Sequence, residues 1–301
     1  MTAPWRHTGS VRLAMAALFM AALFFVAAGR AARGEDAAAL PKPAPAACER
    51  AKFLTVIDVG HTVAVPGAMS ARGVPEYAFN LRLGQAVKQA LLDAGFAKTV
   101  LLITSAAPPL GLVERAVRAN KMRADLFIAI HHDSVPDDLL QTWTYDGQQY
   151  HYNDSYPGYA LFVSYDNPDR AGSLMFGYLL GEALQARGLG YTPHYILPLM
   201  GHRRRELVDA DAGVYRYDQL IVLKDTRMPA VLLEAGSIVN RNEELALASP
   251  ERVALESAAV AAAVEDFCTA RVNRPPLRIV KRPTAPGAAP ARPPHAVRFA
   301  R

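Results

Sequence analysis

The central part of the chain alternates continuous apolar runs with amphipathic segments. Residues 53–59 (FLTVIDV) and 126–130 (LFIAI) are apolar at nearly every position, which is typical of strands buried on both faces of a parallel sheet. Residues 76–94 instead repeat apolar side chains at helical spacing and are followed by Gly95, a suitable C-cap. The alternation predicts an α/β fold of the three-layer αβα type. In this fold a mostly parallel central sheet carries helices on both faces.

The same pattern continues to residue 267. Ser249-Pro250-Glu251 favours a helix start, because serine caps the helix, proline suits its first position and the acid lies near the positive end of the dipole. Residues 134–158 form a connection far longer than the roughly 2–6 residues usual in α/β domains. The remaining expected helices are 112–123, 173–187 and 250–267, and the remaining expected strands are 100–104, 160–164, 220–223 and 231–234.

The first 52 residues differ from this pattern. Basic residues precede the apolar run 13–28, and small residues follow it up to residue 34, which together predict a signal peptide over residues 1–34. The run is short for a membrane span, which needs about 20 residues, although an uncleaved anchor is the alternative. Residues 35–52 read as a Pro/Ala linker. We therefore expect an exported protein of the periplasm or cell envelope.

The other end is basic and rich in proline. Eight Lys or Arg residues and no acid follow Asp266. Because these eight positive charges exceed the net charge of +5, the rest of the chain is slightly acidic. The charge therefore does not indicate a nucleic-acid binder. We expect residues 269–301 to be a disordered tail and residues 53–268 to be the folded domain. The tail either adsorbs to an anionic wall or membrane surface or is solvated without a partner.

Two cysteines flank the predicted domain. Cys48 precedes the first strand, and Cys268 lies at the end of the last helix. Exported proteins meet an oxidising environment, and the ends of a domain often lie close together. The pair is therefore a candidate disulfide, whereas in the cytosol both would be free thiols.

Polar residues stand where three of the predicted strands end. His61 follows the first strand, His131 follows the third, and Glu234 ends the last. In open α/β sheets sites form beyond the carboxyl ends of the strands, and catalytic zinc needs three nitrogen or oxygen ligands and one open position. Spacing does not choose the third ligand. Glu76 is the best candidate because it opens the first helix, but it could equally be an acid favoured by the helix dipole.

Five ordered pieces resemble the zinc-dependent N-acetylmuramoyl-L-alanine amidases. They are VIDVGH at 56–61, Glu76 before Asn80-Leu81, Glu114-Arg115 with Ala119-Asn120, AIHHDS at 129–134 and MPAVLLEAGSIVN at 228–240. The resemblance implies that His61, Glu76 and His131 bind Zn²⁺ and that Glu234 is the catalytic carboxylate. It also implies that the substrate is peptidoglycan, cleaved at the amide between N-acetylmuramic acid and L-alanine.

The chain departs from the family pattern at three positions that leave these groups intact. Thr62 follows the first histidine where glycine is more frequent, and Ser237 replaces a usual aromatic residue near Glu234. His132 doubles the second histidine, and it is expected either behind the metal ligands or facing solvent. Other functions, a zinc carboxypeptidase of the envelope or a non-catalytic wall-binding protein, remain as alternatives. The presence of all four site residues argues against the non-catalytic one.

The connection at 134–158 is rich in aromatic residues, including Trp143 and Tyr145. One interpretation is a wall that stacks on the sugar or stem peptide of the substrate, and the other is a loop packed on itself. Some family members carry a blocking helix in this region. Glycine, asparagine and two prolines without helical periodicity argue against such a helix here.

Overall fold

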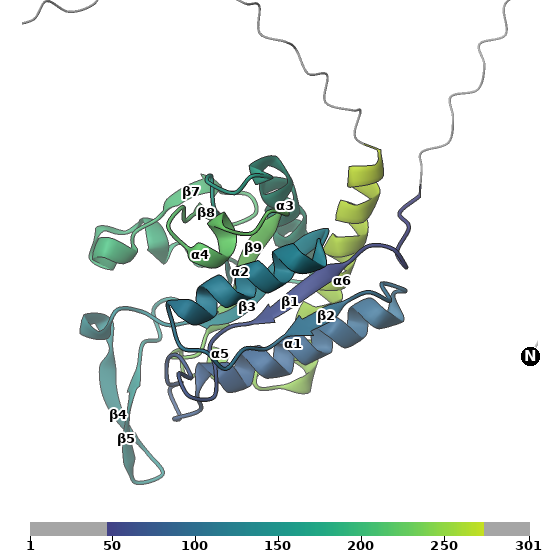
Figure 1. Ribbon diagram of the computed structural model, residues 1–301. Coiled ribbons are helices and arrows are strands. Elements are labelled where there is room, and N and C mark those ends of the chain that lie inside the picture. Colours follow the sequence, from purple (N-terminus) through teal and green to yellow (C-terminus); the bar gives the residue numbers. More distant parts are fainter. Residues whose placement is uncertain (1–46, 274–301) are drawn as a thin grey trace, which may run out of the picture. The chain divides into compact units, whose positions relative to one another are not determined.

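The computed structural model describes residues 47–273, which form a seven-stranded sheet covered by helices (Figure 1). The strands lie in the order β2-β1-β3-β9-β6-β8-β7. Their bounds are β1 Thr55–Val59, β2 Val100–Leu102, β3 Leu126–Asp133, β6 Ala160–Val163, β7 Glu206–Asp209, β8 Val214–Arg216 and β9 Ala230–Ser237. The helices are α1 Glu76–Asp93, α2 Leu110–Met122, α3 Arg170–Gln185, α4 Ile221–Lys224, α5 Glu243–Leu247 and α6 Pro250–Val272.

Most neighbouring strands run parallel, as predicted. β1 pairs in parallel with β2 and with β3, and β3 pairs in parallel with β9. The sheet changes direction at β6, which is antiparallel to β9 and parallel to β8, and β7 is antiparallel to β8. The carboxyl ends of β1, β3 and β9 therefore meet at one edge of the sheet.

The two faces of the sheet bury alternate residues of each strand. On β3, Ile128 and Ile130 pack in a core with apolar residues of α1, α3 and α6. Phe127 and Ala129 face the opposite core, which includes apolar residues of α2 and α4. The period of two along each strand thus produces the three predicted layers.

The structure corrects the prediction at residues 220–223. These residues were expected to form a strand, but Ile221–Lys224 is the one-turn helix α4. Val222 and Leu223 are buried there, so their side chains pack in the core as those of a buried strand would. A short apolar run does not distinguish a buried strand from a buried helical turn, which explains the error. Residues 269–272, expected to open the tail, continue α6 instead.

The long connection after β3 holds a short 3₁₀ turn and a two-stranded hairpin. β4 (Gln141–Tyr145) pairs antiparallel with β5 (Gln148–Tyr152), and the ribbon extends away from the main sheet (Figure 1). Asp146 and Gly147 form its turn with positive φ angles of 48° and 73°. Both values suit a tight two-residue hairpin, for which Asp-Gly is a favoured pair.

The two ends of the described chain are joined covalently. A disulfide links Cys48 to Cys268 with a Cα–Cα distance of 5.4 Å, tying the segment before β1 to α6. Among the described helices, none combines the length and apolar character that crossing a membrane requires. The predicted signal peptide, residues 35–46 of the predicted linker and residues 274–301 of the predicted tail lie outside the described residues.

Candidate metal centre and the adjacent carboxylate

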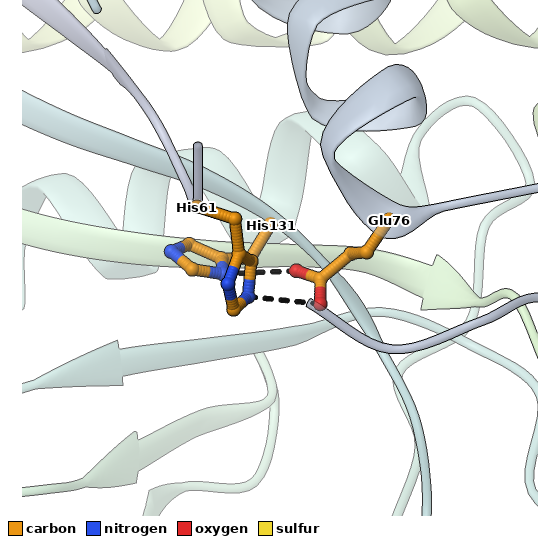
Figure 2. A group of neighbouring side chains, drawn as sticks. All are labelled: His61, Glu76 and His131. Carbon is orange, nitrogen blue, oxygen red and sulfur yellow. Dashed lines mark hydrogen bonds and ion pairs between the residues drawn. The ribbon is translucent and has the colours of Figure 1, made fainter. Parts of the chain in front are cut away.

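Three potential metal ligands converge at the carboxyl edge of the sheet. His61 follows β1, Glu76 is the first residue of α1, and His131 lies on β3. Figure 2 shows the two imidazole rings facing the carboxylate. Glu76 Oε2 lies 2.9 Å from His61 Nε2, and Glu76 Oε1 lies 3.0 Å from His131 Nδ1. One ligand atom from each residue lies within 4.8 Å of the others, which brings the three predicted residues into one cluster.

The backbone around the cluster is shaped to let the three side chains approach. His61 itself has a φ of 65°, an uncommon conformation for a residue other than glycine. A Cβ at Gly60 would lie 2.4 Å from the His131 ring, and a Cβ at Gly67 would lie 2.4 Å from Glu76 Oε2. Because neither space admits a methyl group, both positions require glycine.

A second set of groups holds the Glu76 carboxylate in place. The backbone N–H of Ala68 donates to Oε2 at 3.2 Å, and the Asn80 side-chain amide donates to Oε1 at 3.1 Å. Asn80 Oδ1 lies 2.8 Å from Nδ1 of His132, whose ring is buried against Phe79. His132 therefore lies behind the cluster rather than facing solvent. Burial also lowers the pKa of His132 to about 3, which keeps the ring neutral.

The charge states of the cluster suit cation binding. Burial opposes ionisation of Glu76, but hydrogen bonds with His131 and His61 outweigh it and hold the pKa of Glu76 well below its usual range. Burial lowers the pKa of His131 despite the attraction of Glu76. An ionised carboxylate and a neutral imidazole are the forms in which these side chains ligate metals.

Arg115 of α2 fixes the segment that carries His61. Its buried guanidinium donates to Asp58 Oδ1 at 2.6 Å, to the carbonyl oxygen of His61 at 2.5 Å and to the carbonyl oxygen of Val59. One side chain thus joins α2 to the end of β1 and to the strained residue that follows it. Arg115 was part of the sequence resemblance, but no structural role was predicted for it.

Glu234 lies beside the cluster in a different environment. It pairs with His131 in the register of β9 and β3. Its Oε2 atom is buried and has no hydrogen-bond partner among residues 47–273. Burial, together with the nearby carboxylates of Asp133 and Glu76, raises the pKa of Glu234 well above its usual range, while Arg203 opposes the shift. The structure therefore keeps one carboxyl group next to the cluster without a fixed partner.

Tyr195 and Arg203 complete this side of the site and were not predicted from the sequence. The Tyr195 hydroxyl donates to Asp133 Oδ1 at 2.7 Å, and Arg203 donates to the carbonyl oxygen of Ser134 at 2.7 Å. Both residues come from 3₁₀ turns in the irregular segment between α3 and β7. The only signal for them in the sequence was the basic run His202-Arg203-Arg204-Arg205, which carries no periodicity.

Trp143 and Tyr145 lie on the hairpin, where their rings stack at 5.4 Å between centroids. The Arg72 guanidinium lies 5.2 Å and 5.3 Å from the two ring centroids, and Trp143 Nε1 donates to the carbonyl oxygen of Ala71 at 2.8 Å. The aromatic face of the hairpin thus packs on the loop that leads to Glu76. The hairpin is therefore packed against another loop of the domain, and the predicted stacking of its aromatic residues on the substrate stays a prediction.

Two cavities meet at His131. One, of about 210 Å³, is largely apolar and lies towards α2, with Val65, Leu112 and Val222 in its lining. The other, of about 360 Å³, contains Glu234 together with Tyr195, Arg203 and Arg205. Both share His131, Leu220 and Leu232, and both carry arginine in their lining, Arg115 in the first and Arg203 and Arg205 in the second.

A mostly parallel sheet with a His–Glu–His cluster beside an unpaired carboxyl group defines a candidate mononuclear metal-dependent hydrolase. The sequence profile of the N-acetylmuramoyl-L-alanine amidase family matches residues 55–266. The chain therefore belongs to this family and is a peptidoglycan amidase, which cleaves the amide between N-acetylmuramic acid and L-alanine.

Solved structures share the fold. The N-acetylmuramyl-L-alanine amidase Ami1 from Mycobacterium smegmatis superposes with a TM-score of 0.55 at 17% identity, over 73% of this chain and 98% of that one. Ami1 from Mycobacterium abscessus gives 0.55 at 20% identity, over 72% and 98%. The catalytic domain of CwlV from Paenibacillus polymyxa gives 0.51 at 22%, over 71% and 97%. No individually curated protein matches the sequence.

Proposed function

We propose that this amidase works with Zn²⁺ held by His61, Glu76 and His131, and that Glu234 is its general base and general acid. The observation that carries the proposal is the His–Glu–His cluster with the partner-free Oε2 of Glu234 beside it. Two imidazoles and one carboxylate form a donor set that catalytic zinc prefers. The glycine cradle of Gly60 and Gly67 leaves these donors room to converge on an ion.

Zn²⁺ at this cluster would supply Lewis-acid chemistry, polarising the amide carbonyl and making water acidic enough to attack it. The chain's own residues handle the protons. Glu234 in its ionised form accepts a proton from the attacking water as the new C–O bond forms. It returns that proton to the alanine nitrogen as the C–N bond breaks, so that the products are a free carboxyl group on the muramic acid and a free amine on the stem peptide.

The role of general acid, in which Glu234 returns the proton to the leaving nitrogen, explains the environment of its carboxyl group. A carboxyl group that must give up and accept a proton near neutral pH works best when its pKa is raised towards the working pH. Burial and the neighbouring carboxylates act on Glu234 in that direction. Tyr195 and Arg203 hold Asp133, one of those carboxylates, from the other side.

Metal analysis and hydrolysis together test this function. The purified protein should contain about one zinc per chain, release stem peptides from intact sacculi and lose activity when a chelator removes the metal. His131→Ala should bind no stoichiometric zinc and release no stem peptides. Stoichiometric zinc and normal turnover in His131→Ala would contradict the ligand assignment. Cleavage of free peptides at their C-terminal residue, without release from glycan, would point to a carboxypeptidase instead.

The cellular setting is a further part of the proposal. We assign residues 1–34 to a cleaved signal peptide, residues 35–52 to a linker and residues 53–268 to the catalytic domain, with action in the periplasm or envelope. The support is the sequence pattern of the N-terminus and the peptidoglycan substrate of the family. N-terminal sequencing of the protein recovered from the envelope tests this, because an intact Met1 would refute cleavage.

The basic tail, residues 269–301 in the sequence-based division, is proposed to adsorb to the wall or membrane surface and to be dispensable for catalysis. Exposed charges act over about 8–10 Å at physiological salt, so the attraction should weaken as ionic strength rises. A chain ending at Asn273, after α6, should cleave soluble muropeptides at the parent rate. Compared with the parent protein, it should lose part of its binding to sacculi at low salt and little of it at high salt. Binding unchanged at every salt concentration would refute the electrostatic role.

A further inference from the structure

Arg205 lines the cavity of Glu234 without forming an ion pair with it. Its guanidinium lies 3.7 Å from the centroid of the Tyr217 ring, and its Nη1 donates to the carbonyl oxygens of His202 at 2.9 Å and Arg204 at 2.8 Å. Its Nε is buried and has no hydrogen-bond partner within the described part of the chain. A buried N–H of a charged group left unpaired is unfavourable, which indicates a missing acceptor.

Two other arginines on this side of the molecule have carboxylate partners, whereas Arg204 donates to a backbone carbonyl oxygen. Arg216 pairs with Asp218 at 2.5 Å and with Glu206 at 3.3 Å. Arg203 lies 3.4 Å from Asp133. Arg205 forms no ion pair with a carboxylate within residues 47–273, although it lines the same cavity as Arg203. Two backbone carbonyl oxygens and the Tyr217 ring thus hold the Arg205 guanidinium, which also lines a surface hollow with Glu206 and Asp218 without forming an ion pair with either.

The chemistry of the reaction says which part of the substrate enters this cavity. Glu234 returns a proton to the nitrogen of the leaving alanine, so this nitrogen lies on the Glu234 side of the metal centre. The stem peptide continues from that alanine. The cavity of about 360 Å³ that Arg203 and Arg205 line is the space next to Glu234 that can take this peptide.

We propose that Arg205, assisted by Arg203, binds a free carboxylate of the stem peptide, namely the one on the residue that follows the leaving alanine. The uncharged counterpart of this carboxylate is its amide. A guanidinium forms two parallel hydrogen bonds to a carboxylate but not to a carboxamide. Arg205 thereby selects stems with the free acid. The inference rests on the proposed role of Glu234, because that role sets the direction of the substrate.

Two muropeptides that differ in one group test the proposal. Both are N-acetylmuramoyl tetrapeptides, one with the free carboxyl and one with the amide on the second residue of the stem. The unmodified enzyme should cleave the acid with a kcat/KM about tenfold higher than the amide, an effect expected for one charge-assisted pair. Arg205→Ala should lose this preference, because KM should rise about tenfold more for the acid than for the amide. Arg205→Lys should keep part of it.

Arg204→Ala is the matched control. Arg204 is exposed and donates through Nε to the carbonyl oxygen of Ile196 at 2.8 Å, outside the cavity of Glu234. It should retain the full preference for the acid. Equal cleavage of both substrates by the unmodified enzyme would overturn the proposal, and so would an equal loss on both substrates in Arg205→Ala, which indicates a structural role.

Failure of the proposed function gives a different result. If the role of Glu234 is wrong, Glu234→Gln retains turnover of both substrates whatever Arg205 does. Titration calorimetry with the two free tetrapeptides keeps the selectivity testable without turnover. The unmodified protein should bind the acid about tenfold more tightly than the amide, and Arg205→Ala should bind both alike. Equal affinities for the unmodified protein would end the proposal.

Discussion

The site contains two glutamates that the fold treats in opposite ways. Glu76, at the start of α1, faces two imidazoles and accepts hydrogen bonds from two backbone N–H groups and from Asn80. Glu234, on β9, has a buried Oε2 without any partner in the described chain. The first environment favours the charged carboxylate, and the second disfavours it. Two residues of one type are thereby suited to different tasks, holding a cation and moving a proton.

A third buried glutamate shows that a raised pKa alone does not identify a catalytic residue. Burial raises the pKa of Glu256 to about 7, although Arg252 donates to it at 2.6 Å and opposes the shift. Glu256 lies on α6, one turn beyond Arg252, and lines neither cavity at His131. What distinguishes Glu234 is its place in a cavity at the metal centre together with its lack of a partner.

The largest expected effect comes from replacing each site glutamate by glutamine. Glu76→Gln removes the charge that faces the two histidines, so zinc binding and turnover should both fall to the level of His131→Ala. Glu234→Gln removes the proton carrier but no ligand, so zinc should remain at about one per chain. Its kcat should fall by about 10²–10⁴-fold, the usual contribution of a general acid–base group. Zinc content and stem-peptide release, measured on the same preparations, separate the two outcomes.

Glu256→Gln is the control for this comparison, since it changes a buried glutamate outside the site. It should keep both zinc and turnover. The comparison between Glu76 and Glu234 fails if both variants lose zinc equally. It fails equally if Glu234→Gln turns over at the parent rate.

The sequence predicted the sheet edge well, because long apolar strands followed by His or Glu carry a strong local signal. β1 is buried throughout, and β3 and β9 are buried at every position except His131 and Glu234. The ends of the three strands place His61, His131 and Glu234 at the edge where they were expected. Spacing alone did not select Glu76 over other acids, because its neighbours are set by the path of a loop. The resemblance to the amidases made that choice, and the structure brings Glu76 to both histidines.

The residues that line the cavity of Glu234 opposite the strand ends could not be predicted from the sequence. Tyr195, Arg203 and Arg205 lie in a stretch of 3₁₀ turns without a repeat of apolar positions, so nothing local indicates which way they face. Their contacts with Asp133, Ser134 and Tyr217 join segments that only the tertiary fold brings together. The α4 turn was misassigned for the related reason that four residues carry too little periodicity to separate helix from strand.

A smaller effect should follow from Asn80→Ala, which tests what keeps Glu76 in its favourable environment. Asn80 donates to Glu76 Oε1 at 3.1 Å and to the carbonyl oxygen of Gly60 at 3.3 Å, and its Oδ1 lies 2.8 Å from His132 Nδ1. Groups that orient metal ligands typically contribute about 10–100-fold to metal affinity or activity. We expect zinc affinity, measured by competition with a chelator, to decrease by about 10–100-fold. Excess zinc should restore turnover.

The control for this last variant lies on the same helix. Gln89 is exposed on α1 and donates to Asp93 at 2.8 Å, so Gln89→Ala perturbs the helix without touching the site. It should leave zinc affinity unchanged.

Because Asn80→Ala also leaves the buried His132 ring unpaired, the metal-free protein should lose about 1–3 kcal/mol of stability, measured by denaturant unfolding. Stability lost without any change in zinc affinity would mean that Asn80 supports the core alone. The environment of Glu76 would then depend on the two facing imidazoles and on the backbone N–H groups of Ala68 and His132.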